Sequence, residues 1–177
     1  WSSLNSVSEN KKWQKQSKPK YSNGGSDVNS VLIQELGQLA EALDKEDIDL
    51  TIAGGLGLYL RDLYLDPAGR SPDYPERPES RTTQDLDVFL NPKILASASK
   101  ARQIREIIDN HGYDVGVEHF KFSKVSKQQA TEVGLDLLSA PEKQFRDQLR
   151  VDDIRLKPPE PNTGLHARKT SEAVALR

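Results

Sequence analysis

Two aspartates stand two residues apart in a short apolar segment of this chain. Asp85 and Asp87 alternate with Leu86 and Val88 in a run that ends at Leu90. The alternation predicts a half-buried strand, and side chains at i and i+2 of a strand project from the same face. Two carboxylates on one face repel each other unless a cation lies between them, and their hard oxygens suit Mg²⁺. The segment therefore predicts a metal site, although a solvated acidic pair is the simpler alternative in a chain with 27 acidic residues.

A glycine pair, Gly54 and Gly55, precedes these aspartates by about thirty residues. It separates a predicted strand at residues 48–53 from a predicted helix at residues 56–65. A strand–glycine–helix junction lets the backbone approach a phosphate and points free helix N–H groups at it. A tight turn without a ligand fits the same residues, since the spacing matches neither the Walker A motif nor the dinucleotide fingerprint.

Together these segments resemble the nucleotidyltransferase superfamily, which shares the polymerase-beta-like fold. Its pattern is a strand that ends in Gly-Gly or Gly-Ser, then a helix, then a strand that carries Asp-x-Asp. The chain is most similar to the minimal, abortive-infection (AbiEii-like) toxin-type branch, in which Arg-x-Thr-x-Asp-hydrophobic-Asp recurs. Residues 81–87 match this motif, with Arg81 one residue further from the aspartates than in many relatives. The resemblance covers residues 30–140.

The resemblance implies a third carboxylate on a later strand, and Asp136 in the apolar run of residues 132–138 meets this expectation. On the residues alone, an aspartate among apolar neighbours could equally cap a turn or pair with an arginine. In the family reading, Asp85, Asp87 and Asp136 hold two Mg²⁺ ions, and Asp136 helps to activate an acceptor hydroxyl.

The resemblance further implies that the backbone of Gly54 and Gly55 cradles the phosphates of a nucleoside triphosphate. Arg81 either neutralises triphosphate charge or forms a salt bridge with the preceding acidic loop. The implied activity is transfer of a nucleoside monophosphate to a hydroxyl of an RNA end, a protein or a small molecule. A catalytically silent domain of the same fold, which binds a nucleotide or a protein, is the alternative.

The order of predicted elements favours an α/β (α+β) fold with a small mixed sheet flanked by helices. Helices are expected from residue 29 or 30 to 45 and over residues 93–110, and strands over residues 85–90, 115–122 and 132–138. Residues 139–164 are expected to be mostly irregular, with a helix at 142–149. Arg168 and Lys169 are expected in a last helix, from which they could reach a phosphate.

Composition divides the chain into three parts. Residues 1–29 are rich in Ser, Asn, Lys and Gln and predict a disordered basic leader. Residues 30–140 form the expected nucleotidyltransferase-like domain, in which the proline-rich residues 66–80 predict an inserted surface loop. Residues 141–177 predict an irregular segment and the start of a truncated helical part. The absence of methionine and the first residue, Trp1, predict a fragment or a processed product.

Several classes of protein are disfavoured by the composition. There are no cysteines, so disulfides and cysteine metal sites do not arise. No apolar run is long enough to span a membrane, and no signal-peptide pattern is present, which favours a cytoplasmic protein. The formal net charge of −2 is not that of a protein that coats nucleic acid.

Overall fold

The computed structural model describes residues 26–65, 84–125 and 131–170. In this part of the chain there are five helices: α1 (Ser26–Asp44), α2 (Gly54–Leu65), α3 (Pro92–Ala96), α4 (Ala98–Asn110) and the 3₁₀ helix η1 (Lys143–Gln148). The eight strands are β1 (Thr51–Ile52), β2 (Asp85–Phe89), β3 (Asp114–Val115), β4 (Lys121–Val125), β5 (Glu132–Ser139), β6 (Arg150–Val151), β7 (Arg155–Lys157) and β8 (Ala167–Lys169).

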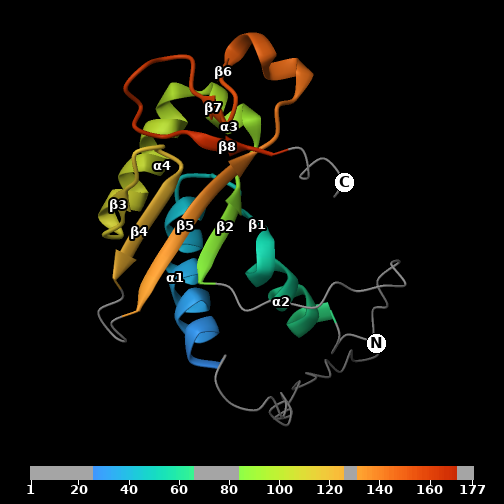
Figure 1. Cartoon of the computed structure of the whole chain (residues 1–177), viewed down its shortest axis with the longest axis vertical. Helices are drawn as coiled ribbons and strands as arrows, with labels where there is room; N and C mark the ends of the chain where they lie inside the picture. The colour runs from blue at the N-terminus through green and yellow to red at the C-terminus, as the bar shows by residue number, and fades with distance from the viewer. Residues whose placement is uncertain (1–25, 66–83, 126–130, 171–177) are drawn as a thin grey trace, which may run out of the picture.

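The strands form one open, mixed sheet in the order β1-β2-β5-β8-β7-β6 (Figure 1). Strand β5 is its centre, because β2 lies on one side while β4 and then β8 pair along the other. Only β2–β5 and β5–β8 are parallel pairs, and the other pairs are antiparallel. The expected α/β class with a mixed sheet is therefore present, and the sheet has more strands than expected.

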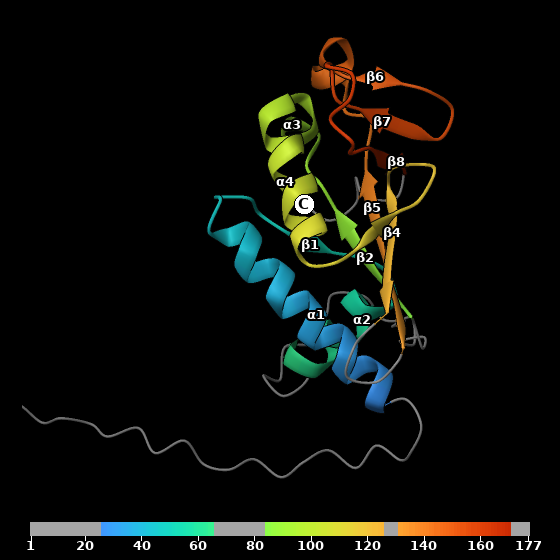
Figure 2. The ribbon, with the colours of Figure 1, turned by 90° about the vertical axis from the view of Figure 1, so that its left-hand side faces the viewer.

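The helices α1, α3 and α4 lie on one side of β2, β4 and β5 (Figure 2). Alternate residues of each strand enter the core that these helices close: Leu86 and Val88 from β2, and Leu135 and Leu137 from β5, are at most 1% exposed. They belong to the same buried cluster as the apolar residues of the helices, which include Leu32, Leu39, Ile104 and Ile108. The period of two along a strand then leaves the other set of side chains on the opposite face.

The helix expected over residues 93–110 is divided into α3 and α4, because the helical backbone is interrupted at Ser97. The backbone of Ser97 is extended, and its side chain accepts a hydrogen bond from the Lys100 N–H at the start of α4. Asn91 caps α3 in the same way, because its side-chain oxygen accepts a hydrogen bond from the Lys93 N–H. Pro92 occupies the first helical position of α3. Serine is a favoured N-cap residue, so Ser97 starts a new helix even though the apolar residues on both sides keep a helical spacing.

The last third of the chain differs most from expectation. Residues 150–169 supply three strands, and Arg168 and Lys169 belong to β8 rather than to a helix. The expected helix at 142–149 is present only as the 3₁₀ turn η1. Strands of two or three residues are too short to show an alternation of apolar and polar residues in the sequence. They are held by pairing with β5 and with each other.

The N-terminal part and two strands also need correction. Residues 1–25 of the expected leader, the loop 66–80 and Arg81 lie outside the described residues, as do residues 171–177. Residues 26–29 belong to α1 rather than to a leader. The strand expected over 48–53 is reduced to β1, and the one over 115–122 is divided by a turn in which His119 has a φ of 60°. Among the described residues, no helix is both long and apolar enough to cross a membrane.

Candidate functional site

The face of the sheet turned away from α1 and α4, called here the open face, carries the predicted carboxylates. Strand pairing aligns its residues in three rows that run from β2 across β5 to β4 or β8. In that order the rows are Asp85, Gly134 and Ser123; Asp87, Asp136 and Lys121; and Phe89, Leu138 and Arg168. The acidic side chains of these rows come from β2 and β5, and the two basic side chains, Lys121 and Arg168, come from β4 and β8.

Asp87 and Asp136 are direct neighbours on parallel strands, which are spaced by about 4.8 Å. Both are half-buried. The pKa of Asp87 is raised, first by burial and then by the negative charges of Asp136 and Asp85. Burial also raises the pKa of Asp136, against the lowering effect of Lys121. A cation bound between these two carboxylates would stabilise their ionised forms, which burial and mutual repulsion disfavour.

Gly54 provides the space into which the Asp87 carboxylate fits. The residue has a φ of +63°, and a Cβ added to it would lie 1.8 Å from Asp87 Oδ2. The neighbouring Ala53 N–H donates to the Asp87 carbonyl at 2.8 Å, which fixes β1 and the start of α2 against β2. Gly54 and Gly55 form the first turn of α2, so the carboxylate stands at the positive end of a helix.

Gly134 stands in a similar relation to Asp85. An added Cβ there would lie 2.1 Å from Asp85 Oδ1, so the Asp85 carboxylate leans over Gly134, its register partner on β5. The three carboxylates predicted from sequence are thus assembled on one face from two strands, against two glycines.

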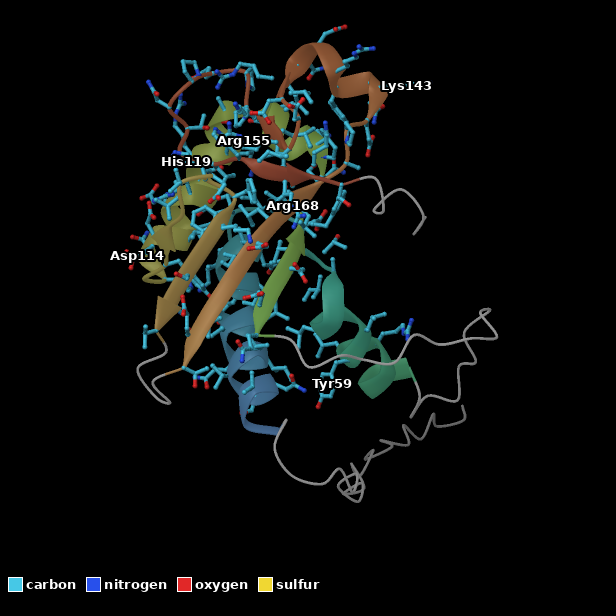
Figure 3. All side chains as sticks on the ribbon, in the orientation of Figure 1. Tyr59, Asp114, His119, Lys143, Arg155 and Arg168 are labelled. Carbon is cyan, nitrogen blue, oxygen red and sulfur yellow. The ribbon has the colours of Figure 1, made fainter. Side chains whose placement is uncertain are left out.

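Basic side chains border the carboxylates on the far side from α2. Lys121 Nζ lies 3.6 Å from Asp136 Oδ2, with the lysine side chain 52% exposed and the aspartate 17% exposed. Arg168 is exposed near the end of β5, where β8 pairs with it in parallel (Figure 3). Both Lys121 and Arg168 lower the pKa of Asp87 and of Asp136 against the effect of burial. A ligand that carries both a cation and an anionic group would find complementary charges here.

The open face is hollowed by a depression of about 290 Å³ over the first two rows, and Asp87 is not part of its lining. The lining residues are Gln84, Asp85, Lys121, Ser123, Glu132, Gly134 and Asp136. A larger one of about 530 Å³ lies beside η1, lined by Pro141, Glu142, Lys143, Arg146, Leu149, Val151 and Leu156. The larger depression contains one carboxylate, that of Glu142, whereas the smaller contains those of Asp85, Glu132 and Asp136. Carboxylate chemistry therefore points to the smaller one.

The donor atoms fit Mg²⁺ in one particular way. In the described segments, no three histidine or carboxylate side chains are grouped closely enough to hold a metal ion by themselves. Mg²⁺ is commonly held by one or two carboxylates together with phosphate oxygens and water. Asp85, Asp87 and Asp136 therefore suit an ion that arrives with a phosphate ligand better than an all-protein cage.

The acidic side of this site was predicted from sequence, whereas on its basic side only Arg168 was named, in a helix rather than in β8. Asp85, Asp87, Asp136, Gly54 and Gly55 are brought together, whereas Arg81 lies outside the described residues. Gly134 had a signal, since it lies two residues before Asp136 and so on the same strand face. Lys121 had none, because its place beside Asp136 depends on the pairing of β4 with β5.

Comparisons with protein-family models, with curated proteins and with solved structures found no match to this chain.

Proposed function

We propose that this chain is a Mg²⁺-dependent nucleotidyltransferase, which moves a nucleoside monophosphate from a nucleoside triphosphate to an acceptor hydroxyl. The observation that carries the proposal is the in-register pair of Asp87 and Asp136 on adjacent parallel strands. It is supported by the contact of Asp87 with Gly54 at the start of α2. A carboxylate pair beside a helix N-terminus offers, within one site, ligands for a cation and N–H donors for phosphate.

Each side chain has a role in this proposal. Asp85 and Asp87 bind Mg²⁺, which when bound neutralises triphosphate charge. The N–H groups of Gly54 and Gly55 and the cations of Lys121 and Arg168 bind phosphate oxygens from opposite sides of the carboxylates.

Asp136 is suited to accept the proton of the attacking hydroxyl, because burial raises its pKa above the ordinary value of an aspartate. The acceptor oxygen forms a bond to the α-phosphorus as the bond to the β-phosphate oxygen breaks. Pyrophosphate leaves with the electron pair of that bond. Positioning and charge neutralisation supply the rate, and no covalent enzyme intermediate is required.

The test is to incubate the protein with Mg²⁺ and each of the four α-labelled nucleoside triphosphates, with total RNA and a protein lysate as acceptors. Asp87→Asn is the inactive variant, and Asp49→Asn, at an exposed position that belongs to none of the three rows, is its matched control. Label transferred by wild type and Asp49→Asn but not by Asp87→Asn supports the proposal and identifies the acceptor class.

Two other outcomes are informative. Nucleotide that binds in a metal-dependent manner without transfer favours the silent binding domain. If neither a divalent ion nor a nucleotide binds to wild type, the assignment of the carboxylates is wrong.

A further inference from the structure

We propose that Gly134 is a positioning residue, whose missing side chain holds Asp85 in its metal-binding orientation. This inference rests on the proposed function of the carboxylates. It concerns a glycine in the middle of β5, where glycine is an unfavourable choice because it weakens a strand and packs nothing.

The backbone of Gly134 gives no reason for a glycine. Among the described residues, the glycines with positive φ are Gly54, Gly112 and Gly164, so Gly134 has a backbone that any residue adopts. Its N–H points to the Gln84 carbonyl at 3.4 Å, as expected for an ordinary ladder position between β2 and β5. The conformational freedom of glycine is therefore not what this position uses.

The space above Gly134 is filled first by the side chain of Asp85. The three atoms nearest to an added Cβ are Asp85 Oδ1 at 2.1 Å, Cγ at 3.0 Å and Cβ at 3.4 Å. Since the third distance is already an ordinary contact, no other neighbour obstructs an alanine. The clash involves the carboxylate group and spares the backbone.

An alanine at this position would move Asp85 and leave the strand in place. Strand β5 is held on both sides, by β2 at Asp85 and by β4 at Ser123. An aspartate has only two side-chain torsions, so its carboxylate relieves the clash by rotating away from β5 and from Asp136. The ligand set would then be opened without loss of any ligand residue.

Gly54 cannot serve the same test, although it meets Asp87 even more closely. Its positive φ makes any other residue strained, so a substitution there would confuse backbone strain with carboxylate displacement. Gly134 separates the two effects.

The experiment compares Gly134→Ala with Gly37→Ala, a helical glycine with nothing within 4 Å of an added Cβ. Mn²⁺ binding is measured by electron paramagnetic resonance, with and without a non-hydrolysable nucleoside triphosphate analogue, and thermal unfolding is measured alongside. We expect both variants to unfold at or above the wild-type temperature, because alanine is favoured over glycine in regular structure. Only Gly134→Ala should lose affinity for Mn²⁺, by about ten-fold or more.

A double variant shows whether the effect passes through Asp85. In an Asp85→Asn background, Gly134→Ala should cause no further loss of Mn²⁺ affinity, because the group that it displaces no longer binds metal. Equal Mn²⁺ affinity in wild type and Gly134→Ala would overturn the inference, as would full additivity of the two changes. Wild type that binds Mn²⁺ but transfers no nucleotide would refute the transfer activity and leave the role of Gly134 intact.

Discussion

Strand β4 carries two lysines that each form an ion pair with a carboxylate, but the two pairs have different surroundings. Lys124 is on the core side, pairs with Glu35 of α1, and both side chains are at most 12% exposed. Its Nζ also donates to the His111 carbonyl at 3.0 Å and lies 4.5 Å from the centre of the Tyr113 ring. Burial and the charge of Glu35 raise the pKa of the Tyr113 hydroxyl, so the phenol stays neutral.

Lys121 lies on the open face, and its ion pair is much looser. Its side chain is half exposed, and its partner Asp136 is crowded by Asp87. Exposed pairs contribute little to stability, whereas a buried pair that loses one partner leaves a costly unpaired charge. Lys124 therefore stabilises the fold, whereas Lys121 and Asp136 are available to bind a ligand.

The largest effect is expected on activity at the open face. Asp87→Asn removes a metal-binding oxygen and should lower nucleotidyl transfer on the order of a thousand-fold. The fold should persist, because the change relieves repulsion with Asp136. Steady-state transfer rates together with circular dichroism check both statements. Transfer at the wild-type rate would remove Asp87 from the site.

The next effect is expected on stability at the core side of β4. Lys124→Met leaves the Glu35 carboxylate buried without its cation and should lower the free energy of unfolding by about 3 kcal/mol. Lys45→Met, which breaks the exposed Lys45–Glu41 pair at 2.9 Å, is the matched control and should leave the free energy of unfolding nearly unchanged. Urea denaturation measures both, and equal costs would contradict the contrast between buried and exposed pairs.

A smaller effect is expected at Lys121. Lys121→Gln should change the free energy of unfolding by less than about 0.5 kcal/mol, since the lysine side chain is 52% exposed and its Nζ is 3.6 Å from Asp136 Oδ2. Affinity for a triphosphate analogue should fall about five-fold, the value of roughly one charge contact of 1 kcal/mol. Lys93→Gln, at an exposed position in α3, is the control in the calorimetric titration. A large loss of stability would show that Lys121 is structural after all.

The smallest effect concerns pH. The pKa of Asp87 is raised above the ordinary 3.8, so the protonated form is favoured in the folded protein. The stability that this supplies is fully present below the unfolded pKa and is lost as the pH rises through the folded one. Asp87→Asn, which cannot ionise, should therefore gain stability over wild type as the pH rises above 3.8 towards neutrality. A gain that shrinks over this range in thermal melts would show the opposite sign.

Much of the fold was predictable wherever a segment is long and regularly apolar. The helices α1 and α4 and the strands β2 and β5 have apolar residues at the spacing of their own periods. Strands β6, β7 and β8 were not predicted, because each is two or three residues long and rich in charge. The break at Ser97 was missed because a serine cap weighs little in sequence against a run of helical spacing.

The candidate site, too, was predictable only where it depends on local sequence. The residues themselves determined that Asp85, Asp87 and Asp136 occupy strands among apolar neighbours, and that a glycine pair precedes a helix. Only the tertiary structure decided that Asp87 and Asp136 stand side by side, and that Lys121, Arg168 and Gly134 belong with them. The physical reason is register. Local spacing sets which face a side chain takes, whereas the pairing of strands distant in sequence is set by the packing of the whole core, and that pairing chooses its neighbours.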